Sequence, residues 1–175
     1  MKHKLIKVAI TGPESVGKST LAQQLAKHFN GRFVREYARD YVENLNRKYT
    51  FDDVEIIARE QCKQYKELDS FYNIPYVFFD TFLIITKIWF DYVWNKHPHW
   101  LDEAIKENKM DLYLLCYPDL KWIPDGAREN ESIRMELFEL YRKELEAYNF
   151  NYQIVKGEGE QRVKNAINII NNLNR

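Results

Sequence analysis

The sequence predicts an α/β fold in which a five-stranded parallel sheet is covered by helices on both faces. Short apolar segments alternate with longer helix-like segments along the 175 residues, which is the pattern of parallel strands joined by crossover helices. The strand segments are apolar throughout, as is typical of strands that are buried on both faces. No repeat, low-complexity tract or linker interrupts the alternation, so we expect residues 1–175 to form a single domain.

Five segments have strand character, and turn or breaker residues separate them from the helices around them. Asn30-Gly31 precedes the second of these segments, Pro75 precedes the third, and Asp80 follows the third directly. The expected strands are residues 5–10, 32–34, 76–79, 112–116 and 152–155.

The intervening segments carry apolar residues at helical spacing. Asp53 follows Thr50 by three residues, which is typical of a capping box at the start of a helix, and Val54, Ile57 and Ala58 begin the apolar face of that helix. The segment 82–94 is apolar almost all round, as in helices that are buried or line a pocket. We expect helices at residues 20–29, 35–46, 50–68, 82–94, 100–107, 133–148 and 163–173.

The turn between the first strand and the first helix has the pattern G-x-x-x-x-G-K-S of a phosphate-binding P-loop. Its glycines let backbone N–H groups approach phosphate oxygens, and the helix N-terminus favours negative charge. Lys18 is expected to reach the β- and γ-phosphates of ATP, and the Ser19 hydroxyl to bind Mg²⁺. The residues expected to cradle the phosphates are Gly12, Pro13, Glu14, Ser15, Val16, Gly17, Lys18, Ser19 and Thr20.

Two carboxylates follow expected strands and would therefore lie at the edge of the sheet where ligands bind. Asp80 is expected to share Mg²⁺ with Ser19, although a carboxylate at this position could instead cap the following helix. Glu36 could accept the proton of an attacking hydroxyl, with Asp80 as the rival base, or it could form a surface pair with Arg35 or Arg39.

The polar segment from residue 118 to residue 134 carries two arginines that could clamp a transferring phosphoryl group. These are Arg128 and Arg134, and the alternative is that they are ordinary surface arginines. Aromatic residues could stack on a flat heterocycle, although helical spacing places most of them in the core. The aromatic candidates are Tyr37, Tyr41, Trp89, Tyr92, Trp94 and Trp100. His97 and His99 flank a proline without a third ligand nearby, which favours loop histidines over a metal site.

The composition argues against several other classes of protein. The chain has 26 basic and 26 acidic residues, whereas nucleic-acid-binding modules usually carry a basic excess. The basic residues are scattered, no apolar run could span a bilayer, and no signal peptide is present. Cys62 and Cys116 have no metal-ligand spacing and fit free thiols in a reducing compartment. We therefore expect a cytoplasmic protein with a small-molecule substrate, and its oligomeric state remains open.

Four motifs occur in an order that resembles a known family. These are the P-loop at residues 12–20, Glu36-Tyr37-Ala38-Arg39, Asp80-Thr81, and the segment 122–128 with the pattern W-x-x-D-G-x-R. Together they resemble the ribosylnicotinamide kinase domain of NadR-like proteins, within the P-loop nucleoside and nucleotide kinases. Two positions on the acceptor side differ from the usual pattern of that family. Phe82 stands where an acid often follows Asp-Thr, and Arg35 stands where some relatives have an aromatic residue.

The resemblance implies a three-layer P-loop kinase fold with strand order 2-3-1-4-5. It also implies a reaction that depends on ATP and Mg²⁺ and phosphorylates the 5′-hydroxyl of nicotinamide riboside, giving nicotinamide mononucleotide. The polar segment 118–134 would be the lid, and Tyr92 would stack on the nicotinamide. The acceptor side would be formed by Glu36, Tyr37, Arg39, Asp80 and Tyr92. The alternatives are a kinase of another nucleoside or nucleotide, and an ATP-binding switch without transfer activity.

Overall fold

The computed structural model describes residues 4–70, 73–122 and 131–173. Its five strands form one parallel sheet in the order β2-β3-β1-β4-β5, so the expected sheet and strand order are confirmed. The central strand β1 pairs with β3 on one side and with β4 on the other. The strands are β1 (Ile6–Thr11), β2 (Arg32–Val34), β3 (Tyr76–Asp80), β4 (Leu112–Cys116) and β5 (Tyr152–Val155).

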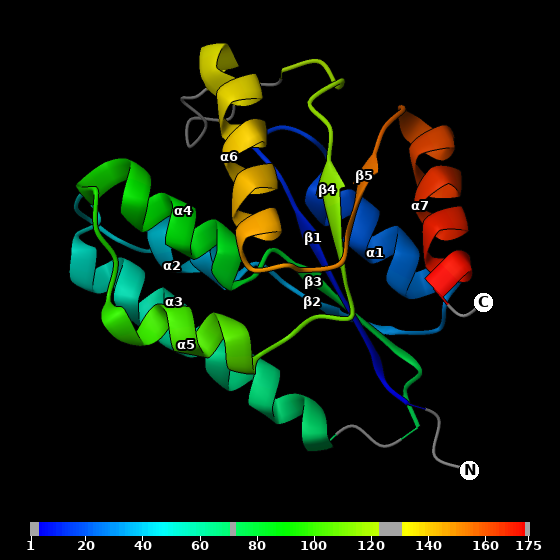
Figure 1. Ribbon diagram of the computed structural model, residues 1–175, viewed down its shortest axis with the longest axis horizontal. Coiled ribbons are helices and arrows are strands. Elements are labelled where there is room, and N and C mark those ends of the chain that lie inside the picture. The colour runs from blue at the N-terminus through cyan, green and yellow to red at the C-terminus, as the bar shows by residue number, and fades with distance from the viewer. Residues whose placement is uncertain (1–3, 71–72, 123–130, 174–175) are drawn as a thin grey trace.

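Helices cover both faces of the sheet, as Figure 1 shows. The helices α1 (Lys18–His28) and α7 (Gly159–Leu173) lie on one face. The other face is covered by α3 (Phe51–Lys66), α4 (Leu83–Trp94), α5 (His99–Glu107) and α6 (Arg134–Ala147). The short helix α2 (Tyr37–Glu43) and the 3₁₀ turns η1 (Glu67–Ser70) and η2 (Glu131–Ile133) complete the described elements.

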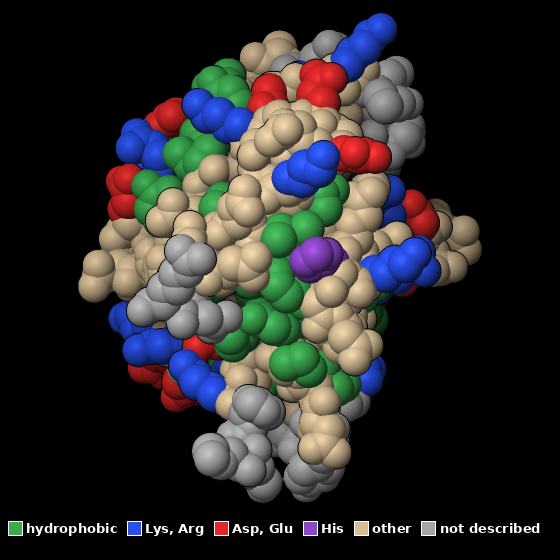
Figure 2. Space-filling view, turned by 90° about the vertical axis from the view of Figure 1, so that its right-hand side faces the viewer, with side chains coloured by type: hydrophobic (Ala, Val, Ile, Leu, Met, Phe, Trp, Pro, Cys, Tyr) green, Lys and Arg blue, Asp and Glu red, His purple; other side chains and the backbone are tan. Residues whose placement is uncertain are grey.

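The central strand contributes side chains to both cores, which explains the continuous apolar run Val8-Ala9-Ile10 within it. Val8 and Ile10 pack into the core beneath α1 and α7, whereas Ala9 packs into the core beneath α3–α6. All three are fully buried. In Figure 2, hydrophobic side chains reach the surface in the middle of the face that carries α7. Phe29 and Leu173 are among the partly buried residues that pack against the α1/α7 core.

Helix ends account for the differences from the expected elements. The capping box at the start of α3 is confirmed, because Thr50 and Asp53 make its reciprocal hydrogen bonds. The helix α2 ends at Glu43, three residues earlier than expected, where the Asn44 amide donates to the Asp40 carbonyl at 2.6 Å. An asparagine side chain that bonds a nearby backbone carbonyl competes with helix continuation. The residues that follow α3 form the separate turn η1.

The described helices include none that is long and apolar enough to cross a membrane.

Candidate active site

The P-loop connects the end of β1 to the start of α1, and its backbone conformation requires glycine. Gly12 has φ +132°, and a Cβ atom there would lie 2.9 Å from the carbonyl oxygen of Cys116 in β4. Gly17 is left-handed, with φ +71°, and it is the N-cap of α1. The loop therefore bends tightly against the neighbouring strand and ends at a helix N-terminus, which is the arrangement that binds phosphate.

The ammonium of Lys18 lies across this loop. Its Nζ donates to the carbonyl oxygen of Pro13 at 2.7 Å, and its charge acts on the carboxyl groups of Glu36 and Asp80. Lys18 is thus the positive group around which the two expected acids gather.

Asp80 is a buried carboxylate at the end of β3, with an exposed fraction of 2%. Burial raises its pKa, although a hydrogen bond with Ser19 and the charge of Lys18 oppose the shift. The atom Oδ1 is buried and has no hydrogen-bond partner among the described residues. Asp80 does not cap the next helix, because the N-cap of α4 is Phe82, which makes no side-chain capping bond to the described chain. A buried carboxylate oxygen beside the Ser19 hydroxyl fits the oxygen ligands that Mg²⁺ prefers.

Glu36 is the N-cap of α2 and faces Lys18 and Asp80. Burial and the nearby charge of Asp80 raise its pKa, and Lys18 and Arg39 oppose the shift. Its Oε2 lies 3.6 Å from Nε of Arg39, and its side chain is 19% exposed. Arg35 pairs instead with Asp40, at 2.7 Å. Glu36 therefore makes the surface pair considered as an alternative, but it also faces Lys18 and Asp80 across the site.

Arg134 reaches the P-loop from the first turn of α6. Its Nη1 donates to the carbonyl oxygens of Leu120 at 3.0 Å and of Ser15 at 3.5 Å. Its guanidinium also lies 5.6 Å from the centre of the Trp122 ring. The other expected clamp, Arg128, and residues 123–130 of the expected lid lie outside the described residues.

Most of the aromatic candidates have structural partners. Trp89 and Trp94 form edge contacts with Tyr49, and Trp100 donates to Glu55 at 3.0 Å. Tyr37 and Tyr41 both belong to α2 and contact each other, with ring centres 5.9 Å apart. Tyr92 is 51% exposed on α4, and its expected role toward the nicotinamide stays a prediction.

The two histidines expected in a loop have different surroundings, and His99 belongs to a helix. Nδ1 of His97 lies 2.6 Å from Oδ1 of Asp91, and its Nε2 lies 3.0 Å from Oδ2 of Asp102. His97 thus bridges α4 and α5, whereas His99 is the first residue of α5.

The sequence reasoning missed Tyr141 as a neighbour of the site. It belongs to α6 and is buried there. Burial raises its pKa, and the charges of Glu36 and of Glu14 in the P-loop raise it further. The sequence carries one signal for this residue. Tyr141 places a hydroxyl on the apolar face of α6, two turns after Arg134 and therefore on the same side of the helix.

A second feature that the sequence did not reveal is a buried arginine that joins the segments after β4 and β5. Arg162 of α7 is only 4% exposed, and its guanidinium donates to the carbonyl oxygens of Val155 at 3.1 Å and Tyr117 at 2.8 Å. It also pairs with Asp119 at 2.9 Å, which in turn accepts a hydrogen bond from the backbone N–H of Gly157. The chain that follows β4 is thereby tied to the chain that follows β5.

Comparison with known proteins agrees with this geometry. The trifunctional NAD biosynthesis/regulator protein NadR of Escherichia coli K12 is 33% identical over an alignment of 160 residues, which covers 86% of this chain and 38% of the relative. A crystal structure of a NadR protein in complex with NR superimposes with a TM-score of 0.83 at 28% identity. It covers 96% of this chain, which spans 51% of that one. A NadR complex with NAD and AMP-PNP gives a TM-score of 0.78 at 26% identity, with 96% of this chain and 49% of that chain covered.

More distant structures share the fold alone. The deoxyadenosine kinase from M. mycoides has a TM-score of 0.66 at 18% identity, with 95% of this chain and all of that chain covered. The architecture is therefore that of the P-loop kinases, and the resemblance to NadR-like domains is confirmed. A family model described as an AAA domain, AAA_28, matches residues 7–162. Because this match covers well over half of the sequence, the chain belongs to the AAA_28 family of AAA domains.

Proposed function

We propose that the protein is a phosphotransferase that uses ATP and Mg²⁺ to phosphorylate nicotinamide riboside on its 5′-hydroxyl, giving nicotinamide mononucleotide. The observation that carries the proposal is the convergence of Lys18, Glu36 and the Ser19–Asp80 pair at the ends of neighbouring strands. The likeness to a NadR protein bound to NR supports the choice of acceptor, and the AMP-PNP complex of NadR supports ATP as the donor.

Each residue of the site has a role in this reaction. The P-loop N–H groups and the N-terminus of α1 hold the triphosphate, and Lys18 exchanges its bond to Pro13 for the β- and γ-phosphate oxygens. Ser19 and Asp80 would hold Mg²⁺, which neutralises phosphate charge when it is bound. Arg134 lies close enough to the loop to stabilise the transferring group.

The proton of the acceptor hydroxyl goes to a carboxylate. Because Asp80 is engaged with Ser19, Glu36 is the better base, and its raised pKa suits proton acceptance. The acceptor oxygen forms a bond to the γ-phosphorus, the bond from that phosphorus to the bridging oxygen breaks, and ADP leaves. Tyr37, Arg39 and Tyr92 complete the acceptor side in this proposal.

A second candidate keeps the transfer and changes the acceptor to another nucleoside or nucleotide. It is favoured by the two acceptor-side positions that differ from the usual pattern of the NadR-like kinases, Phe82 and Arg35. Arg35 is largely exposed and pairs with Asp40 at 2.7 Å.

The test is phosphate transfer from ATP to a panel of acceptors that includes nicotinamide riboside, common nucleosides, nucleoside monophosphates and a blank without acceptor. The Lys18→Ala variant serves as the matched control without transfer. The proposal expects nicotinamide riboside to give the highest kcat/KM. Product no greater than that of the blank would refute nicotinamide riboside as the acceptor, and a preference for another nucleoside would establish the second candidate.

A further inference from the structure

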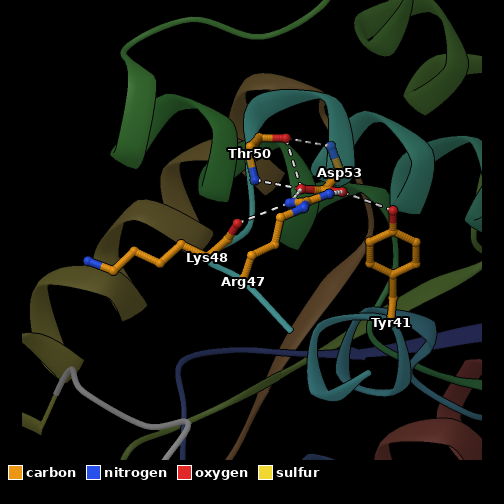
Figure 3. A network of polar contacts seen from close by, with 5 residues as sticks. All are labelled: Tyr41, Arg47, Lys48, Thr50 and Asp53. Atoms are coloured by element: carbon orange, nitrogen blue, oxygen red, sulfur yellow. Dashed lines mark hydrogen bonds and ion pairs between the residues drawn. The ribbon is translucent and has the colours of Figure 1, made fainter. Parts of the chain in front are cut away.

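Asp53, in the first turn of α3, is the centre of a dense polar network. Its carboxylate is 2% exposed and accepts from Nη1 of Arg47 at 2.6 Å and Nη2 at 2.9 Å. The backbone N–H and the hydroxyl of Thr50 donate to it at 2.7 and 2.8 Å, and the Tyr41 hydroxyl donates at 3.0 Å. Figure 3 shows Thr50 and Arg47 on one side of the carboxylate and Tyr41 on the other.

Helix capping accounts for only part of this network. The capping box needs the two bonds between Thr50 and Asp53. The bidentate pair with Arg47 and the bond from Tyr41 are additional, and they come from the loop after α2 and from α2 itself. Together they hold the pKa of Asp53 well below its usual range, with the Arg47 bonds making the largest contribution, so the carboxylate is charged at every physiological pH.

The helix α2 is short and buries little apolar surface. It has seven residues, too few to be stable alone. Within α2, which is described in full, Ala38 is the one buried residue. The helix packs against α3, and Tyr41, in its last turn, bonds the first turn of α3. The polar network therefore supplies much of the attachment that apolar packing does not.

This attachment lies one helix turn from the acceptor side of the site. Glu36 immediately precedes α2, and Arg39, its partner at 3.6 Å, belongs to the same helix. Tyr41 contacts the Tyr37 ring. A short helix moves as a unit, so a shift at Tyr41 also moves Glu36 relative to Asp80.

We propose that Asp53 is a positioning residue for the acceptor side of the site: through Tyr41 and Arg47 it holds α2 so that Glu36 and Arg39 face Lys18 and Asp80. The proposal rests on the proposed function, because it assigns the α2 side of the site to the acceptor. It predicts that loosening the network impairs acceptor use while ATP binding is retained, since the P-loop lies on β1 and α1.

The test uses Tyr41→Phe, which removes one hydroxyl from the network and keeps the ring. We expect the KM for the acceptor to rise about three- to tenfold, the range of one lost hydrogen bond of ordinary strength, with the KM for ATP changed by less than about twofold. Backbone amides of α2 should exchange with deuterium faster than in the wild type, and those of α7 should not. Asp53→Asn should cause a larger change of the same kind.

Two controls separate positioning from general stability. Tyr152→Phe removes a tyrosine hydroxyl that donates to Glu146 at 2.7 Å, far from α2 along the chain, and should leave both KM values unchanged. Thr50→Ala removes the side-chain cap of α3 and leaves the Tyr41 bond intact, so it should lower the melting temperature with a smaller effect on acceptor KM.

Three results would overturn the proposal. The first is an acceptor KM and an α2 exchange rate in Tyr41→Phe that equal those of the wild type, and the second is an equal rise of both KM values. The third is a Thr50→Ala variant that reproduces the Tyr41→Phe effect in full. If wild-type protein phosphorylates none of the acceptors, the proposed function fails, and the exchange of α2 amides still decides whether the network anchors that helix.

Discussion

Replacing Gly12 by alanine tests the geometry of the phosphate loop most directly. With φ +132°, Gly12 occupies a region that costs other residues about 1–3 kcal/mol. The new Cβ would also lie 2.9 Å from the carbonyl oxygen and 3.3 Å from the nitrogen of Cys116. Because both atoms are backbone atoms of β4, relief requires movement of the strand or the loop, at about another 1–3 kcal/mol. We therefore expect Gly12→Ala to destabilise the protein by about 2–6 kcal/mol.

Gly159→Ala is a matched control, since that glycine is also left-handed, with φ +49°, but no described heavy atom lies within 4 Å of the position of its Cβ. Its cost should be only about 1–2 kcal/mol. The assay is urea unfolding of both variants with and without AMP-PNP and Mg²⁺. A ligand at one hundred times its Kd stabilises the folded state by about 2.7 kcal/mol, and Gly12→Ala should lose this increment while Gly159→Ala keeps it. Equal unfolding free energies and equal nucleotide increments in the two variants would refute the reasoning.

Three further variants probe other parts of the molecule. Glu36→Gln should bind ATP normally by calorimetry yet lower kcat by on the order of 10²-fold, the loss expected for a general base; an unchanged kcat would remove Glu36 from that role. Burial lowers the pKa of His97, but its bonds to Asp91 and Asp102 outweigh burial and raise it. The stability that His97→Gln loses should therefore be largest below about pH 6.5 and shrink as pH rises, in urea unfolding at several pH values; a difference that grows with pH would contradict this sign. Arg162→Gln should destabilise the protein by about 2–3 kcal/mol, less than for a fully buried pair because Asp119 is partly exposed, whereas Lys164→Gln on the same helix should not; equal melting temperatures would disprove it.

The regular elements and their order could be predicted from sequence because they depend on local patterns. The P-loop pattern predicted the turn between β1 and α1, and the Thr50–Asp53 spacing predicted the start of α3. Strands β2, β4 and β5 have the expected bounds. Of these three, β4 is buried along its whole length, as its unbroken apolar run predicts, whereas the edge strands β2 and β5 expose Arg32, Gln153 and Ile154.

The side-chain partnerships could not be predicted in the same way. The spacing of Asp80 and Glu36 after their strands indicated a shared edge of the sheet, but not that Arg39 would pair with Glu36 while Arg35 turned to Asp40. Long-range pairs such as Arg162–Asp119 depend on how helices and loops pack after the fold has formed. Such contacts leave no periodic signal in the chain, because either partner alone resembles an ordinary surface charge.

The position of β1 in the middle of the sheet has a consequence for how the protein acquires its binding competence. Its neighbours β3 and β4 come from far along the chain, and pairings between distant segments form slowly because long loops must close first. The floor beneath Gly12 is Cys116, at the end of β4. During synthesis, the phosphate loop therefore gains its neighbouring strand only after β4 has left the ribosome, long after the loop itself has emerged.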